Sequence, residues 1–208
     1  EIMPSLVGSE MCIRDREAIM REIKVQEITA AVSKLCKDSC YYLPEELLEK
    51  LKASIATEES PLGQEILTTI VENAELAKAK DVPICQDTGM TVVFLRIGQE
   101  VHIEGDFLEA AVNEGIRQGY AEGYLRKSVV SDPILRENTK DNTPGVIHYE
   151  IVPGDKLEIT VAPKGFGSEN MSRVFMLKPA DGIEGVKQAV IQAVKDAGPN
   201  ACPPMVIG

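Results

Sequence analysis

Apolar residues recur every three to four positions through the first third of the chain, a spacing that predicts three amphipathic helices. The first spans residues 20–36 and the second spans residues 44–55. The third begins at Pro61 with Ser60 as its cap, and it ends before Pro83. A serine cap followed by proline at the first helical position is a typical helix start. We therefore expect a helical N-terminal region.

After this region the pattern changes from helical spacing to runs that are typical of strands. Residues 91–97, TVVFLRI, are rich in β-branched and apolar residues and contain no glycine or proline break. Two later segments, VIHYEIV at 146–152 and KLEITV at 156–161, alternate on either side of a Pro-Gly-Asp turn. This arrangement predicts a β-hairpin.

Helical spacing returns twice in the second half of the chain. Asp106 with Glu109 three residues later resembles a capping box and predicts a helix that runs to about Tyr124. The last helix spans 183–197 and is ended by a glycine and a proline. Residues 129–145 are polar and predict a surface loop. The fold class we expect is α+β: an N-terminal helical region packed on a small, mainly antiparallel sheet, with further helices.

The two ends of the chain differ from the part between them. Residues 1–19 have no periodicity, so we expect a non-native extension there and leave Cys12 out of the functional argument. Residues 20–208 are expected to form one domain. The last eight residues, ACPPMVIG, end on an apolar run typical of the start of a buried strand. We therefore expect the domain to be incomplete at its C-terminus.

Composition and charge narrow the class of protein. The chain has 44% hydrophobic and 26% charged residues, as soluble globular proteins do. Its net charge of -11 repels phosphate backbones, so we expect no nucleic-acid partner. No apolar run reaches the length of about 18 residues that a membrane span needs, and we expect a cytoplasmic protein with no membrane partner. Its five cysteines favour reduced thiols or metal ligands over a disulfide framework.

Several residues that could carry chemistry also have ordinary structural explanations. Cys36 and Cys40 lie near a helix end, but no second zinc-type pair accompanies them, which favours a structural role. His102 and His148 are far apart, and a surface or partly buried histidine is the favoured interpretation of each. GFGSEN at 165–170 lacks the third glycine and the lysine of a phosphate-binding loop. A ligand-binding loop and a plain turn explain it equally well.

Cys85 and Cys202 occupy similar positions in the pattern. Each lies just after a predicted helix, beside a proline and before an apolar run, so each could be held at the rim of a sheet. Two thiolates suggest a soft metal or an iron-sulfur cluster. Spacing alone favours two buried thiols over such a cluster.

Three segments together resemble a known family. They are PICQDTGM at 83–90, PKGFGSENMS at 163–172 and NACPP at 200–204. In this order they resemble the alpha subunit of the class I, iron-sulfur-dependent fumarate hydratases and of the related L(+)-tartrate dehydratases. The resemblance covers residues 20–208.

The resemblance implies a 4Fe-4S cluster that is held by three cysteines and leaves one iron open to substrate. Cys85 and Cys202 match the first two ligand positions. The third cysteine ligand is expected beyond Gly208.

The resemblance also assigns residues to the substrate. Gln86 would donate a hydrogen bond to a carboxylate, and Asp87 would act as the catalytic group that orients the substrate hydroxyl or a water. Arg126 matches an arginine that binds a carboxylate through its planar fork. Gly167 matches a glycine whose backbone approaches the substrate, although Phe166 stands where the family more commonly has glycine. The segment that follows would supply further contacts from Asn170, Met171, Ser172 and Arg173.

The activity that the resemblance implies is reversible hydration of fumarate to L-malate, with the open iron as a Lewis acid. L(+)-tartrate dehydration is the alternative reaction, and the shared motifs do not separate the two small dicarboxylate substrates; we favour fumarate and malate. A non-catalytic assembly or binding fragment without a competent cluster is the alternative class. Further substrate arginines and a catalytic threonine would come from a beta subunit. We therefore expect an alpha-beta heterodimer or heterotetramer, and no activity from this chain alone.

Overall fold

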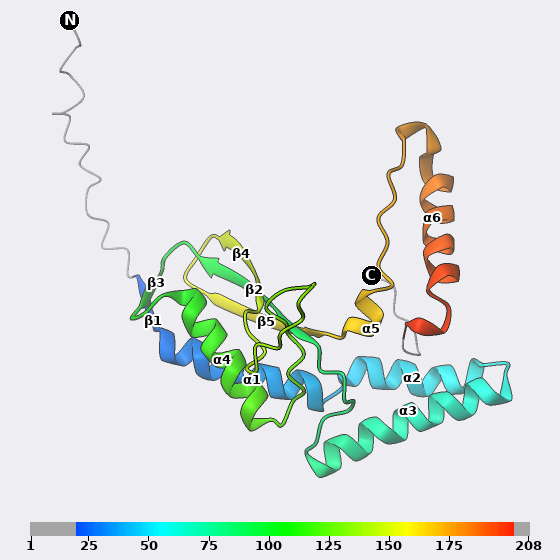
Figure 1. Cartoon of the computed structure of the whole chain (residues 1–208), viewed down its shortest axis with the longest axis horizontal. Helices are drawn as coiled ribbons and strands as arrows, with labels where there is room; N and C mark the ends of the chain where they lie inside the picture. The colour runs from blue at the N-terminus through cyan, green and yellow to red at the C-terminus, as the bar shows by residue number, and fades with distance from the viewer. Residues whose placement is uncertain (1–19, 202–208) are drawn as a thin grey trace, which may run out of the picture.

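The computed structural model describes residues 20–201 and has an α+β fold, as expected (Figure 1). Residues 1–19 and 202–208 lie outside the described residues, and with them the predicted extension, Cys12, Cys202 and the terminal strand. In chain order the elements are β1 (Arg21–Lys24), α1 (Val25–Tyr41), α2 (Glu45–Thr57), α3 (Pro61–Lys80), β2 (Met90–Gly98), β3 (Val101–Glu104), α4 (Leu108–Glu122), β4 (Val146–Val152), β5 (Leu157–Lys164), α5 (Phe166–Glu169) and α6 (Gly182–Ala197).

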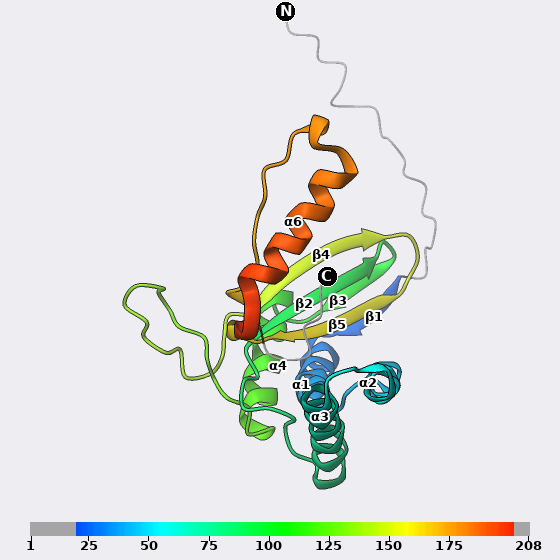
Figure 2. The ribbon, with the colours of Figure 1, turned by 90° about the vertical axis from the view of Figure 1, so that its right-hand side faces the viewer.

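A three-stranded sheet lies on two helices at the centre of the molecule. Its strand order is β4-β2-β5, and α1 and α4 cover one face (Figure 2). The central strand β2 places Val93 and Leu95 in the core, where both side chains are almost completely buried. Apolar residues of both helices meet them there: Ile28, Val32 and Cys36 from α1, and Val112, Ile116 and Tyr120 from α4. This layer is the hydrophobic core.

The sheet is mixed, whereas the sequence pattern predicted mainly antiparallel pairing. β2 pairs with β4 in parallel and with β5 in antiparallel register. A second, two-stranded sheet pairs β1 with β3 in parallel. The predicted hairpin of β4 and β5 is wrong, because β2 lies between them.

The turn after β4 passes around the end of β2 rather than closing a hairpin. The Gly98 N–H donates to the Lys156 carbonyl (2.7 Å), and the Gln99 N–H donates to the Val152 carbonyl (2.8 Å). A side chain at Gly98 would place its Cβ 2.3 Å from the Gly154 carbonyl oxygen, so glycine allows this close approach. Alternating polarity specifies which face of a strand is buried, but it does not specify the neighbouring strand.

Most predicted helices are confirmed, with two corrections at their starts. The first helix begins at Val25, because the preceding residues form β1 and hydrogen-bond to β3, a strand that the sequence pattern did not predict. The Asp106 capping box is wrong. The Asp106 carboxylate accepts a hydrogen bond from the adjacent Phe107 N–H (2.7 Å), and Phe107 is the N-cap of α4. The Ser60 cap is confirmed, since its hydroxyl accepts from the Gly63 N–H (3.3 Å).

Two parts of the chain extend away from the central layer. Helices α2 and α3 pack against each other on one side, and α6 stands apart from the sheet after a long connection (Figures 1 and 2). The apolar face of α6 is exposed at Ile183, Val186 and Val190. Among residues 20–201, no helix combines the length and the hydrophobicity that a membrane crossing requires.

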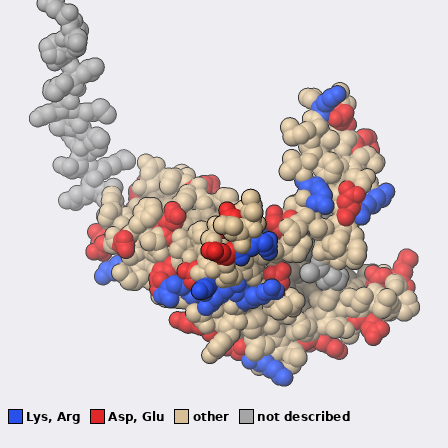
Figure 3. All heavy atoms as spheres, in the orientation of Figure 1, with Lys and Arg blue, Asp and Glu red and all other residues tan. Residues whose placement is uncertain are grey.

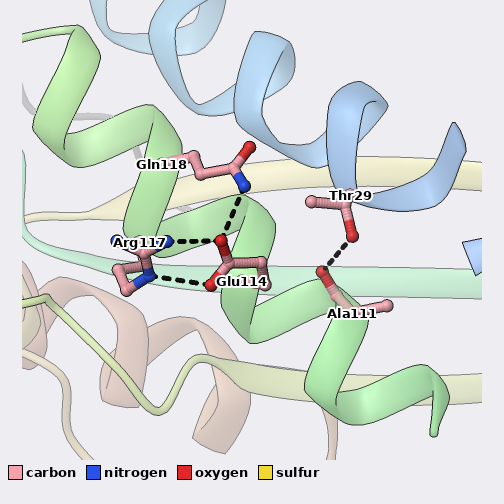
Figure 4. A network of polar contacts seen from close by, with 5 residues as sticks. All are labelled: Thr29, Ala111, Glu114, Arg117 and Gln118. Atoms are coloured by element: carbon pink, nitrogen blue, oxygen red, sulfur yellow. Dashed lines mark hydrogen bonds and ion pairs between the residues drawn. The ribbon is translucent and has the colours of Figure 1, made fainter. Parts of the chain in front are cut away.

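Helices α1 and α4 approach each other closely because α4 has glycine at the contact. A Cβ on Gly119 would lie 2.7 Å from the Ser33 carbonyl oxygen and 2.9 Å from the Cys36 Cβ. The Thr29 hydroxyl donates to the Ala111 carbonyl (2.9 Å) and links the same two helices (Figure 4). Since the Ser33 obstacle is backbone, it cannot move aside as a flexible side chain could. The contact therefore requires glycine.

Replacement of Gly119 by alanine is expected to destabilise the protein. Alanine favours helix over glycine by about 1 kcal/mol, but overpacking against a rigid backbone costs about 1 to 3 kcal/mol. We expect the steric cost to dominate, and denaturant unfolding would measure it. Gly63→Ala is the control, because the three atoms nearest to its new Cβ all belong to the flexible Glu58 side chain. Equal stability of the two variants would contradict this account of the helix contact.

Candidate functional site

The loop that contains Cys85 connects α3 to β2 and presents the cysteine to solvent. Cys85 is exposed, and its thiol donates a hydrogen bond to the Gln86 side-chain oxygen (3.3 Å). The Asp87 backbone N–H donates to the Cys85 sulfur (3.4 Å). The Ile84 N–H donates to the Cys40 carbonyl at the end of α1 (3.0 Å). The loop is thus anchored on the core side, while its thiol faces outward.

Two of the three sequence motifs are in direct contact through glycines. Gly89 has a φ of 58°, and a Cβ there would lie 2.0 Å from the Lys164 carbonyl oxygen. A Cβ on Gly165 would lie 2.9 Å from an Asp87 carboxylate oxygen. The Cys85 loop and the glycine loop after β5 can pack this closely only because neither position has a side chain.

Hydrogen bonds attach the segment around Arg126 to the same loop. The Thr88 hydroxyl donates to the Arg126 carbonyl (3.0 Å), and the Tyr120 hydroxyl donates to the Thr88 carbonyl (2.7 Å). Thr88 and Tyr120 are both buried. These bonds fix the backbone at Arg126 while its side chain stays exposed.

Asn142 is the central polar residue of this region and is completely buried. Its side-chain oxygen accepts hydrogen bonds from the Ser128 N–H (2.7 Å) and the Val129 N–H (3.2 Å). Its side-chain nitrogen donates to the Gly89 carbonyl (3.1 Å). One amide therefore joins the Cys85 loop to the segment that follows Arg126. Its left-handed backbone, with φ of 65°, is a conformation that asparagine tolerates better than most residues.

A cavity of about 460 Å³ opens where these segments meet. Its lining combines cations, amides and one carboxylate from four parts of the chain: Asp87, Arg126, Lys127, Ser128, Val130, Arg136, Asn138, Phe166 and Asn170. In the described part of the chain, none of the three cations forms an ion pair. The cavity therefore has an excess of positive charge suited to an anionic ligand.

Some other surface cations, among them arginines on α4 and β2, form ion pairs with neighbouring carboxylates. Arg117 hydrogen-bonds Glu114 on the same helix (2.7 Å) and lowers the pKa of that carboxyl to about 2, with help from Gln118 (Figure 4). Arg96 bonds both Glu150 and Glu158 across the sheet. In the space-filling view, lysine and arginine gather over α4 and the loop after it, with acids around them (Figure 3). By contrast, the cations of the cavity have no ion-pair partner among the described residues.

The structure brings together some of the residues that the sequence analysis selected. Asp87, Arg126 and Asn170 line the cavity, and Cys85 and Gln86 precede Asp87 on the same exposed loop. Gly167 lies on α5 outside the lining. Three further predicted residues follow α5 and also lie outside it: Met171, Ser172 and Arg173. The Arg173 side chain donates instead to backbone carbonyls of its own turn.

Four further polar residues of the cavity were not predicted as site residues from the sequence: Lys127, Ser128, Arg136 and Asn138. Two of them lie in the segment that was assigned to a surface loop. That segment has left-handed backbone at three non-glycine residues, Arg136, Lys140 and Asn142. Its density of Asn and Asp is a turn signal in the sequence, but this signal does not indicate which side chains reach a cavity.

Cys36, Cys40 and the two histidines do not line the cavity. Burial raises the pKa of Cys36 to about 12 and that of Cys40 to about 11, so both thiols stay neutral at physiological pH. His102 and His148 are exposed, and the His148 ring stacks on Phe94. Within residues 20–201, no group of three or more His, Cys, Asp or Glu side chains could bind a metal ion. Cys85 is the exposed cysteine of this part of the chain.

Comparison with known proteins identifies the class of this chain. A family model described as fumarate hydratase (Fumerase) matches residues 29–208. The chain therefore belongs to the family that includes the fumarate hydratases and the L(+)-tartrate dehydratase alpha subunits.

Two relatives have names that are more specific. A Methanocaldococcus jannaschii protein, provisionally named L(+)-tartrate dehydratase subunit alpha, is 38% identical over 189 residues. The L(+)-tartrate dehydratase subunit alpha of Escherichia coli strain K12 is 29% identical over 188 residues. Each alignment covers 88% of this chain, and 66% and 61% of the two relatives, respectively. The chain thus spans less than two thirds of the length of these relatives.

Asn142→Ala is expected to separate the segments that form the cavity. It leaves two N–H groups and one carbonyl without their buried partner, and each orphaned group costs about 1 to 3 kcal/mol. We expect a loss of about 3 kcal/mol or more in the free energy of unfolding. Asn73→Ala, which removes one exposed bond to the Ile84 carbonyl, is the control. Similar losses in the two variants would contradict the structural role of Asn142.

The three described cysteines should differ in reactivity in the native protein. We expect iodoacetamide at pH 8 to alkylate Cys85 and to spare Cys36 and Cys40, because alkylation needs an accessible thiolate. Peptide mapping by mass spectrometry would assign each label, with urea-unfolded protein as the control in which all three react. Native labelling of Cys36 as fast as that of Cys85 would contradict the burial of Cys36.

Proposed function

We propose that this chain is the alpha-type subunit of an iron-sulfur hydro-lyase that acts on a small hydroxy dicarboxylate. The observation that carries the proposal is the cavity next to the Cys85 loop, which Arg126 and Lys127 line together with Asp87 while forming no ion pair in the described part of the chain. A dicarboxylate needs positive charge, and an acidic chain must concentrate that charge locally. Family membership supports the same reaction class.

The substrate we propose is L(+)-tartrate, which reverses the order of preference drawn from the sequence motifs. Those motifs favoured fumarate and malate, whereas the relatives described above carry tartrate dehydratase names. The family model carries the fumarate hydratase name, so fumarate and malate remain the second candidate pair.

Cys85 fits the role of a cluster ligand. It is exposed on an anchored loop, where its sulfur is accessible and accepts a hydrogen bond from the Asp87 N–H. Cys36 and Cys40 do not fit, because burial keeps them protonated. Cys202 is the proposed second ligand and lies outside the described residues. When bound, a 4Fe-4S cluster would supply Lewis-acid activation of the substrate hydroxyl.

The residues of the chain would bind and orient the substrate. Arg126 binds one carboxylate with two parallel hydrogen bonds, and the Gln86 amide donates to a carboxylate oxygen from the exposed loop. Asp87 accepts a hydrogen bond from the substrate hydroxyl and holds it in the orientation for loss as water. Asn170 contributes an amide to the same cavity. Four residues keep the predicted role of contacts near the substrate: Gly167, Met171, Ser172 and Arg173.

A beta subunit is part of the proposal, because the relatives are named as alpha subunits. The exposed apolar face of α6 also supports association with a further part of the assembly, since such faces are usually covered. The complete assembly is therefore the form in which activity should be measured.

The decisive experiment assays the full-length alpha-beta assembly, prepared without oxygen, on L(+)-tartrate and on fumarate and malate. We expect the higher kcat/KM on tartrate. Activity on fumarate and malate alone would overturn the choice of substrate, and no activity on any of them would overturn the reaction class.

Cluster binding has a separate optical readout. The visible charge-transfer absorption of thiolate-bound iron should be lost in Cys85→Ser and kept in Cys36→Ser, the matched control. The opposite result would overturn the ligand assignment of Cys85.

A further inference from the structure

Arg136 has a position in the cavity that the proposed function does not explain. It lies in the loop between Val130 and Asn138, ten residues after Arg126, and lines the same cavity as Arg126 and Lys127. The side chain is exposed and forms no ion pair with any residue in the described range 20–201. The chain's overall charge of -11 means that carboxylates are abundant elsewhere on the molecule. An unpaired guanidinium on the cavity wall is therefore available to a ligand.

The loop holds Arg136 in an uncommon backbone conformation. Its φ is 57°, in the left-handed region that disfavours side chains other than those of glycine, asparagine and aspartate. Asp132 organises the turn before it: its carboxylate accepts from the Ile134 N–H (2.8 Å) and the Leu135 N–H (2.7 Å). The Arg136 N–H donates to the Asp132 carbonyl (2.8 Å). Strained backbone of this kind is often found where a ligand is bound.

Both ends of the loop are attached to the Arg126 segment. Val130 and Asn138 form an antiparallel bridge, and the Ser131 N–H donates to the Glu137 carbonyl (2.8 Å). The Asn138 side chain donates to the Lys127 carbonyl (2.9 Å). Because the loop is closed on itself and tied to Lys127, the positions of Arg126 and Arg136 are coupled. Two guanidinium groups on one preorganised frame suit a ligand with two anionic groups.

We propose that Arg136 binds the second carboxylate of the dicarboxylate whose first carboxylate Arg126 binds. This inference rests on the proposed function and deepens it, since it makes Arg136 a determinant of selectivity for dicarboxylates over monocarboxylates. Ser128 lies between the two arginines in the chain and Asn138 follows Arg136; both line the cavity and offer neutral hydrogen-bonding groups for the substrate hydroxyls.

The test is equilibrium binding of succinate and of propionate to the full alpha-beta enzyme by calorimetry. Arg136→Gln should weaken succinate binding about 10- to 100-fold, the value of one hydrogen bond to a charged group. It should change propionate binding by less than about 2-fold, because a monocarboxylate needs only Arg126. Arg136→Lys should restore part of the affinity, since it keeps the charge and loses the planar fork.

Two further variants separate binding from folding and from general charge. Lys140→Gln removes one charge two residues after the end of the loop and outside the cavity lining, and we expect no change in succinate affinity. Arg136→Asn replaces the guanidinium by a side chain that tolerates left-handed backbone. Its melting temperature should be equal to or above that of the wild type, while its succinate affinity falls as in Arg136→Gln.

The outcomes distinguish this inference from the proposed function. Unchanged succinate binding in Arg136→Gln, or equal weakening of propionate, overturns the role of Arg136, while wild-type turnover of tartrate leaves the proposed function in place. If succinate binding weakens in Arg126→Gln but not in Arg136→Gln, the role of Arg136 is overturned in the same way. If the wild-type enzyme neither turns over the candidate substrates nor binds succinate, both proposals are overturned.

Discussion

The buried amide of Asn142 is the interaction on which the cavity depends. An unsatisfied amide is costly inside a protein, so all three of its hydrogen bonds must form together. Those bonds place Gly89 of the Cys85 loop beside Ser128 and Val129, which follow Arg126. The hydrophobic core of α1, β2 and α4 provides the rigid base on which this joint is built. The hydrogen bonds of Asn142 thus specify the arrangement of the segments around the cavity, while apolar packing stabilises the fold beneath them.

The main electrostatic feature of the cavity is a group of cations in its lining. Surface arginines on β2 and α4 are neutralised by neighbouring glutamates, whereas the cations of the cavity have no such partners among the described residues. Three such cations lie together in one cavity of an acidic molecule. The positive charge of the cavity attracts a dianionic substrate, although the net negative charge of the chain repels it.

The sequence predicted the elements better than their arrangement. Helices α2, α3 and α6 follow from apolar periodicity and local caps, which are properties of short segments. The position of β2 between β4 and β5 depends on contacts between distant segments, and alternating polarity does not encode it. In the site, motifs identified Asp87, Arg126 and Asn170. Arg136 and Asn138 were missed because loop geometry, rather than any periodic pattern, brings them to the cavity.

We propose the cavity between the Cys85 loop and the Arg126 segment as the substrate site. A crystal structure of the full alpha-beta enzyme, grown without oxygen in the presence of succinate, would test it most directly. We expect succinate in this cavity, with one carboxylate hydrogen-bonded to the Arg126 guanidinium. Succinate bound at another site, with this cavity filled only by water, would show that the substrate site lies elsewhere.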